Sequence, residues 1–389
     1  MGPVDAPVAP RERRISFAEF PQRVWWRKAL FQVHLWVGVF IGLYVVAISL
    51  SGSLLVFEQN LLDDVPVVPH ASQAGPLSWG QIARAAEAAW PGSSLSFIDM
   101  RTARRRVVSV SLRQNGQERL VYIDSFSGRV LGEEIPQRRH WLVEWAESFH
   151  NQLAAGAEGA TANGVGGALL FVMSVTGIVL WWPGRKGWTR ALKVKWNARW
   201  ARLNWDLHSA FGFWCLFFIS MWGLSGAYFI FPRPFQRVIS IFSPVTHLRD
   251  LPSDWQPGQP VLPVDTLVGR AMALYPRDQL AYLYMDVNRP HGVVKVFLSP
   301  RPSAPLTFVE DVVTYQPATG AVLSNISSAA WTRGERLAMG IYAVHFGTFA
   351  GLPGQIVFAA IGLAPLLLAV TGYLMWWKRV LKKKWAALR

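Results

Sequence analysis

Four histidines stand at matched positions in two copies of a longer pattern. His34 and His208 are each followed, at the same offsets, by a glycine and a Leu-Ser-Gly triplet. His150 and His345 form a second pair: each is followed, at offsets that the two share, by a glycine, a Thr-Gly pair and a Trp-Trp pair. An imidazole in or beside lipid costs free energy, so a chain that keeps one at matched positions in two copies is expected to use it. The matching residues are Gly38, Leu50-Ser51-Gly52, Gly212 and Leu224-Ser225-Gly226 for the first pair, and Gly167, Thr176-Gly177, Trp181-Trp182, Gly362, Thr371-Gly372 and Trp376-Trp377 for the second.

The chemistry that these histidines favour is ligation of haem iron. A lone intramembrane histidine can simply be packed in a helix bundle and hydrogen-bonded to a neighbouring carbonyl. Four in repeat-related positions favour ligation instead, because neutral imidazole is a good axial donor and haem is a flat, apolar cofactor that fits between helices. Cys215 is the only cysteine, which excludes disulfides, a thiolate zinc site, an iron–sulfur cluster and covalent haem attachment through C-x-x-C-H.

The composition indicates an integral membrane protein. Hydrophobic residues make up 51% and charged residues only 16% of the 389-residue chain. Four apolar runs are long enough to cross a bilayer as helices, in which the backbone pairs its own polar groups. Many of the 20 tryptophans stand at the ends of these runs, as in the aromatic belt of a membrane interface. The runs are Ala29–Phe57, Val165–Trp182, Leu207–Phe231 and Gln355–Trp377.

The placement of lysine and arginine predicts which side of the membrane each segment occupies. Residues 1–28, 183–206 and 378–389 hold 6, 7 and 6 basic residues but only 3, 1 and 0 acidic ones, and so carry the whole net charge of +15. By the positive-inside rule these short segments are cytoplasmic, with both termini inside. Residues 58–164 and 232–354 then lie outside. The basic charge therefore reflects topology and contact with anionic lipid, and no nucleic acid is expected as a partner.

The two outer segments also match each other. Ser78–Trp90 and Val264–Tyr275 have helical apolar spacing, and each is followed by a proline. Alternating stretches follow and predict antiparallel strands: VVSVSLR and RLVYID in the first segment, GVVKVFLS and FVEDVVTY in the second. Each copy closes with a turn and a short strand, at residues 127–131 and 319–323. A helix packed on a small antiparallel sheet is therefore expected in each segment.

Over nearly its whole length the sequence resembles the PepSY-associated transmembrane proteins, often called iron-regulated membrane proteins, and within them it is most similar to ferric-siderophore reductases of the FoxB type. The H-x3-G…L-S-G helices, the T-G-x3-W-W helices and the S/T-G-x-V-L strand of each outer segment carry the resemblance. It implies a multi-pass protein of the bacterial inner (cytoplasmic) membrane, with a haem b cofactor and electron delivery to a ferric chelate. The expected fold is a membrane α-helical bundle of four transmembrane helices in two tandem repeats, with two α+β PepSY-like periplasmic domains.

The depth of each histidine predicts two bis-histidine haem sites. His34 and His208 stand near the cytoplasmic ends of outward-running helices, whereas His150 and His345 precede inward-running ones. Two axial ligands of one haem must lie at one depth, and Phe57 is already about 35 Å along a helix from His34. We therefore expect His34 with His208 at an inner haem b, and His150 with His345 at an outer one, with a pseudo-two-fold axis along the membrane normal.

Glycines make the outer pair's surroundings harder to predict. Several follow His150, at positions 156, 159, 164, 166 and 167, and others follow His345 together with Pro353. They are expected to break the helix, which would leave each outer ligand on a separate segment at the outer boundary of the bundle. The other four histidines, His70, His140, His247 and His291, have no matched partner and are expected at the surface or in loops.

These expectations define an enzyme and two alternatives. The leading hypothesis is a di-haem oxidoreductase that reduces a ferric siderophore in the periplasm to release ferrous iron. The sequence has no nucleotide-binding motif, so the expected electron donor is quinol or a cytoplasmic or membrane protein. The alternatives are a PepSY-type binding or regulatory membrane protein without redox activity, and a haem b reductase for another periplasmic acceptor. No residue points to one siderophore.

Overall fold

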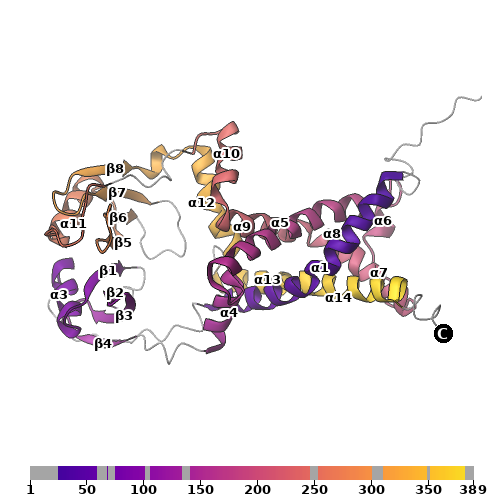
Figure 1. The fold of residues 1–389 in the computed structure, drawn as a ribbon, viewed down its shortest axis with the longest axis horizontal. Helices are drawn as coiled ribbons and strands as arrows, with labels where there is room; N and C mark the ends of the chain where they lie inside the picture. Colours follow the sequence, from indigo (N-terminus) through magenta and orange to yellow (C-terminus); the bar gives the residue numbers. More distant parts are fainter. Residues whose placement is uncertain are drawn as a thin grey trace, which may run out of the picture. The chain divides into compact units, whose positions relative to one another are not determined.

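The computed structural model describes residues 25–58, 68, 75–100, 106–133, 141–245, 253–299, 310–347 and 351–381 (Figure 1). The chain divides into two compact units. The first comprises Met1–Ser53, Phe149–Ile230 and Ala359–Arg389, and the second comprises Leu54–Ser148 and Phe231–Phe358. Residues 1–24 and 382–389, most of the predicted cytoplasmic tails, lie outside the described residues, as do His70, His140 and His247.

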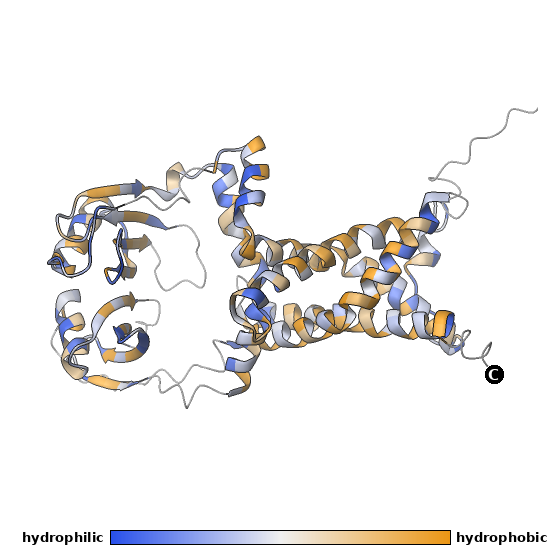
Figure 2. Cartoon of the chain, viewed as in Figure 1, coloured by the Kyte–Doolittle hydropathy of each residue, from blue (hydrophilic) through white to orange (hydrophobic). Residues whose placement is uncertain are grey.

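The first unit is a bundle of apolar helices (Figure 2). Within the described ranges, three helices are long and apolar enough to cross a membrane, and a bent pair makes a fourth if it is one span. The elements are α1 (Trp25–Leu55), α5 (Gly156–Trp181), the bent pair of α7 (Trp200–Asp206), η3 (Leu207–Phe211), α8 (Gly212–Trp214) and α9 (Leu216–Ile230), and a last helix of α13 (Gly351–Gly362), α14 (Ala364–Trp376) and η6 (Trp377–Leu381), of which α13 belongs to this unit only from Ala359 onward.

Of the glycines predicted to break the chain here, only Gly156 does so, with a φ of 61° at the start of α5. α5 then runs without interruption to residue 181, so the prediction was wrong for the later glycines. Two of these lie where neighbouring atoms leave no room for a side chain. A Cβ on Gly166 would lie 2.3 Å from the Tyr44 ring, and one on Gly167 would lie 2.9 Å from the carbonyl oxygen of Gly223. Small residues let membrane helices approach closely, and here they make a continuous helix that packs tightly.

The break in this region comes earlier, directly after the histidine. Leu153 and Ala154 have positive φ angles of 50° and 54° and form the turn between α4 (Trp141–Gln152) and α5. In the second outer segment the predicted break is present, because α12 (Arg333–Phe346) ends at Gly347, whose φ is 66°. Both outer histidines therefore lie near the ends of short helices, α4 and α12, that precede an apolar helix.

The third apolar run differs from its prediction in start and shape. It begins at Trp200, before the predicted Leu207, and its halves are bent by 65° at Cys215. The turn of π-helix η3 lies before this bend and carries His208. π-Helical turns are often found at functional positions. Because α1 is one unbroken helix, the two predicted repeats differ at this point.

The second unit contains one eight-stranded antiparallel sheet, where the sequence predicted two smaller ones. The strand order is β4-β3-β2-β1-β5-β6-β7-β8. The first four strands come from the first outer segment and the last four from the second. The halves meet where β1 pairs with β5, through Phe97 with Tyr284 and Ile98 with Leu283. The strands are β1 (Ser94–Asp99), β2 (Val107–Gln114), β3 (Gln117–Asp124), β4 (Val130–Glu133), β5 (Gln279–Asp286), β6 (Val293–Ser299), β7 (Asp311–Tyr315) and β8 (Val322–Ile326).

Two helices cover the sheet and share one apolar core with it. α3 (Trp79–Ala89) and α11 (Val264–Leu274) confirm the predicted helices, and residues of both join a single buried cluster with all the central strands. Ser78 caps α3 in a reciprocal box with Gln81. Asp265 of the second half accepts hydrogen bonds from the Ser78 hydroxyl (2.8 Å) and the Gly80 amide (2.9 Å) of the first half. The two halves therefore form one structural domain.

Two carboxyl groups lie side by side at one edge of this domain. Asp278 follows α11, and Asp311 begins β7. Burial, and then the hydrogen bond and charge of Asp311, raise the pKa of Asp278 to about 6. Because the folded pKa lies above the ordinary value, Asp278 favours folding at low pH, and this contribution is lost as the pH rises between about 4 and 6.

We predict that Asp278→Asn raises the thermal midpoint of the sheet domain at pH 7.5 and leaves it nearly unchanged at pH 4, because the amide resembles the protonated carboxyl. Thermal unfolding of the full chain followed by circular dichroism at both pH values measures this. Glu118→Gln on β3, which removes an exposed carboxylate, serves as the control. Equal changes at the two pH values for Asp278→Asn would contradict the prediction.

Candidate functional site

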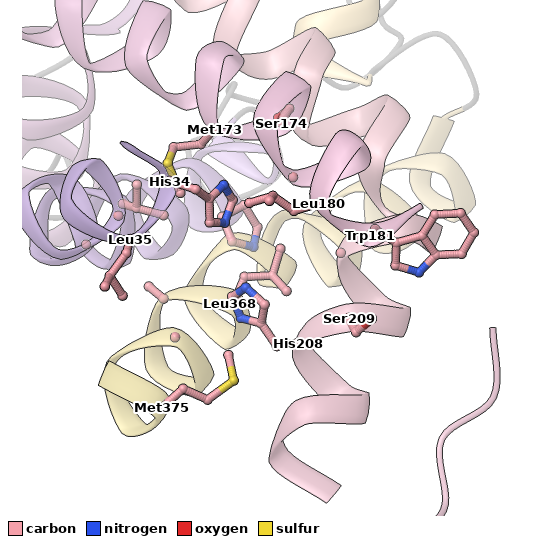
Figure 3. A pocket seen from close by; sticks show the side chains of 18 of the residues that line it. His34, Leu35, Met173, Ser174, Leu180, Trp181, His208, Ser209, Leu368 and Met375 are labelled. Carbon is pink, nitrogen blue, oxygen red and sulfur yellow. The ribbon is translucent and has the colours of Figure 1, made fainter. Parts of the chain in front are cut away.

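A cavity of about 260 Å³ lies between the helices of the first unit (Figure 3). Its walls come from α1, α5, the bent third helix and α14, and they are mostly aliphatic, aromatic or methionine side chains. His34 and His208 line it, and both rings point toward the same space between the helices. Ligand cavities in helix bundles are typically built this way, from side chains that project inward from facing helices.

The structure brings the two predicted inner ligands together. The ring centroids of His34 and His208 are 6.4 Å apart, and the ring planes are perpendicular, at 89°. His34 comes from the first half of α1 and His208 from η3, so the two rings approach each other from different helices across the bundle. The short α8 separates η3 from the bend of the third helix, so His208 lies on the part of that helix that precedes the bend.

A threonine on a neighbouring helix holds each of these rings. Nδ1 of His34 lies 2.9 Å from Oγ1 of Thr176, and Nδ1 of His208 lies 2.9 Å from Oγ1 of Thr371. Each threonine hydroxyl donates its own proton to a backbone carbonyl one turn earlier in its helix, at 2.9 and 2.7 Å. The hydroxyl oxygen must then accept a hydrogen bond from the imidazole. Nδ1 therefore carries the ring proton, and Nε2 keeps its lone pair. This is the tautomer that ligates a metal through Nε2.

The glycine after each threonine lies against the ring. A Cβ on Gly177 would lie 3.4 Å from Cε1 of His34, an ordinary contact, and a Cβ on Gly372 would lie 3.3 Å from Cε1 of His208, slightly closer than usual. The Thr-Gly pair thus orients the imidazole through the threonine and packs against it through the glycine. The sequence contained this signal in the two Thr-Gly pairs, but their spacing alone did not connect them with the histidines of other helices.

The first outer histidine is held by a similar arrangement. Nδ1 of His150 lies 3.2 Å from Oγ of Ser51, and a Cβ on Gly52 would lie 2.7 Å from its Cε1. The backbone carbonyl of His150 accepts a 2.6 Å hydrogen bond from Asn163. Burial lowers the pKa of His150 to about 4, so the ring is neutral at physiological pH. Ser51 and Gly52 of the Leu-Ser-Gly triplet therefore contact His150 in the same way that Thr176 and Gly177 contact His34.

The second outer histidine belongs to the other unit. His345 stands near the end of α12, and its ring packs edge-on against Phe346, with centroids 5.6 Å apart. The pairing of His150 with His345 stays a prediction from the sequence. His291, one of the unmatched histidines, lies in the sheet domain, where its Nδ1 is 2.5 Å from the Ser253 carbonyl oxygen.

The described residues contain no cluster of three or more His, Cys, Asp or Glu side chains that could hold a bare metal ion. A structural or catalytic ion bound by protein alone usually has at least three such ligands. Two facing imidazoles suit a metal whose other donors belong to a cofactor. The site geometry therefore fits axial ligation better than a bare ion.

Comparison with known protein families places these residues within one family. The family model described as "PepSY-associated TM region" matches residues 31–379, a stretch that includes all four predicted ligands. No curated protein matches the chain.

We predict that Thr176→Val lowers stability by about 1–3 kcal/mol, because it leaves the buried Nδ1–H of His34 without an acceptor. Thr176→Ser keeps the hydroxyl and should restore most of the loss. Thr161→Val is the matched control, since Thr161 lies on the same helix and donates to a carbonyl one turn earlier but is exposed. Thermal unfolding in detergent measures all three. A loss as large for Thr161→Val as for Thr176→Val would contradict the assigned role.

Proposed function

Because the chain belongs to the family of proteins with a PepSY-associated transmembrane region, a multi-pass membrane family, we propose that it is a di-haem reductase. In this proposal His34 and His208 are the axial ligands of one haem b, and His150 and His345 those of a second. Electrons enter from quinol or a protein donor and leave to a ferric siderophore on the opposite side of the membrane.

The facing imidazoles of the inner pair are the observation that carries this proposal. If His34 and His208 held one metal between them through Nε2, with bonds of about 2.0–2.1 Å and roughly 1.1 Å from ring nitrogen to ring centre, the ring centroids would be about 6.3 Å apart. The centroids of His34 and His208 are 6.4 Å apart. The threonine contacts, which place the proton on Nδ1, add independent support, because hydrogen-bonded Nδ1–H is the usual partner of an Nε2 ligand.

The surrounding residues support the same assignment through the environment they create. The cavity walls are apolar, so they fit the flat face of a porphyrin and keep water from it. Haem iron, when bound, would accept and pass on single electrons. The protein's part is to hold both imidazoles in the ligating tautomer and to exclude water from the space between them. A hydroxyl that accepts a hydrogen bond from Nδ1–H makes the imidazole a more basic ligand and fixes the orientation of its ring.

The outer site has weaker support, and from one ligand only. His150 is neutral, buried and anchored through Nδ1 to Ser51, as an axial ligand would be. His345 enters the proposal through its repeat-related position in the sequence. If both sites bind haem at different depths, an electron can cross the bilayer in two steps.

Ferric siderophores are the proposed acceptors because of the resemblance to FoxB-type reductases. Reduction weakens the hold of hard oxygen ligands on iron, so a reductase facing the periplasm would release ferrous iron for import. The excess of basic residues on the short segments supports an inner-membrane location with both termini in the cytoplasm.

Haem content tests the proposal. We expect purified wild-type protein to contain two b-type haems per chain, seen as Soret and α bands and quantified as pyridine haemochrome. His34→Ala and His208→Ala should each remove the inner haem, and His150→Ala and His345→Ala the outer one. His291→Ala is the control and should keep both. Absence of both bands in the wild type would overturn the proposal and favour a regulatory membrane protein.

The acceptor is tested by oxidation of the reduced protein. We expect dithionite-reduced protein to be re-oxidised faster by a ferric hydroxamate or ferric catecholate siderophore than by a flavin or a water-soluble quinone, under anaerobic stopped-flow conditions. The α-band absorbance reports the rate, and a gallium-loaded siderophore, which cannot accept an electron, is the control. Faster oxidation by the flavin or quinone would assign the protein to another acceptor.

A further inference from the structure

Unpaired hydrogen-bond donors gather at the end of the bundle where α1 begins and α5 and α14 end, called here the basic end. Nε1 of Trp181, Trp182 and Trp376 and Nη1 of Arg27 are buried and have no hydrogen-bond partner among the described residues. Of these indoles, those of Trp181 and Trp376 line the cavity and that of Trp182 does not. Arg27 is fixed beside them, because its Nη2 donates to the carbonyl oxygen of Leu180. Buried donors without acceptors cost free energy, so a ligand that brings acceptors is expected here.

The charge of the cavity shows what kind of acceptor is missing. Arg379 lines the cavity, and its guanidinium carbon lies 4.5 Å from the centre of the Phe31 ring. No aspartate or glutamate is among the residues that line the cavity. The basic end therefore offers two guanidinium groups and two indole N–H groups without a counter-charge from the cavity wall. Donors of this type bind carboxylates or phosphates most strongly.

The position of the donors relative to the histidines is also defined. Trp181 follows Gly177 by four residues, and Trp376 follows Gly372 by four. Each indole thus stands one helical turn, about 6 Å, beyond the glycine that contacts an imidazole. Trp181 is held in place by stacking on Phe213, with ring centroids 4.0 Å apart and planes at 21°.

We infer that Arg27, Trp181 and Trp376, together with Arg379, bind the two propionate carboxylates of the inner haem, an inference that rests on the proposed function. His34, His208, Trp181 and Trp376 line the same cavity, so a flat cofactor held by the two imidazoles would have an edge within reach of the basic end. Two carboxylates on that edge match two guanidinium and two indole donors. A single lipid phosphate, the other anion available at a membrane surface, would satisfy fewer of these donors.

This inference gives the Trp-Trp motif a role that an interfacial aromatic belt does not explain. An interfacial tryptophan places its N–H in the wet headgroup region. The indole N–H groups of Trp181 and Trp376 are buried instead and stand at matching distances from the two Thr-Gly pairs. In the proposed site, the first tryptophan of each motif is a propionate donor.

Binding of haem and of its dimethyl ester, which lacks the negative charges, tests the inference. Protein produced under haem limitation is titrated with each compound, and the Soret band reports the affinity. We expect the wild type to bind haem at least about tenfold more tightly than the ester at the inner site. Arg27→Gln, Trp181→Phe and Trp376→Phe should each reduce this ratio by weakening haem binding while leaving ester binding unchanged. Trp188→Phe is the matched control, since Trp188 packs against Trp181 but is not among the unpaired donors.

The midpoint potential of the inner haem gives a second readout. Arg27→Gln removes a positive charge that stabilises the ferrous form relative to the ferric form, so we expect a lower potential, with no shift in Trp188→Phe.

Two outcomes separate this inference from the proposed function. Equal wild-type affinities for haem and ester, both lost in His34→Ala, would overturn the propionate site and leave the haem assignment standing. Loss of bound phospholipid from Arg27→Gln without any change in the haem-to-ester ratio would assign the donors to lipid instead. Failure of the wild type to bind either compound would overturn both proposals.

Discussion

The hydrogen bond from each inner imidazole to a threonine on a neighbouring helix is the interaction on which the candidate site depends. It fixes the rotation of the ring, and it also fixes the proton on Nδ1, because the hydroxyl has already given its own proton to a backbone carbonyl. The same contact occurs in both predicted repeats, between His34 and Thr176 and between His208 and Thr371. The ligating form of each ring therefore depends on helix packing. His34 is held only if α1 lies beside α5, and His208 only if η3 lies beside α14.

Close packing of the helices makes these contacts possible. Glycines stand where a Cβ would overlap a neighbouring ring or backbone, as at Gly166 against Tyr44 and at Gly167 against Gly223. In lipid, where apolar side chains gain little by leaving the solvent, such close approach is a main source of helix association. The glycines that complicated the sequence-based prediction of α5 are therefore part of the reason that the bundle can position its polar residues.

The sheet domain follows a different physical rule. Each outer segment has a stretch of helical apolar spacing and alternating strands, and these features predicted α3, α11 and strands β2, β3, β4, β6, β7 and β8 correctly. β1 and β5 were missed, although they are the central pair that joins the halves. The sequence indicated two small sheets. Pairing between their edges yields one sheet, which removes two exposed edges and lets both helices contribute to one core.

What the sequence alone determined is local or additive: apolar length, basic-residue placement, helical spacing, strand alternation, and the repeated spacing of four histidines. These properties depend on a residue and its near neighbours along the chain. The tertiary structure alone decided the contacts between distant segments: the hydrogen bond of His34 to Thr176, the perpendicular packing of the His34 and His208 rings, and the β1–β5 pairing. It also decided the bend at Cys215. Spacing along a chain cannot specify them, because each depends on which helix or strand lies beside which, and that is set by the packing of all of them together.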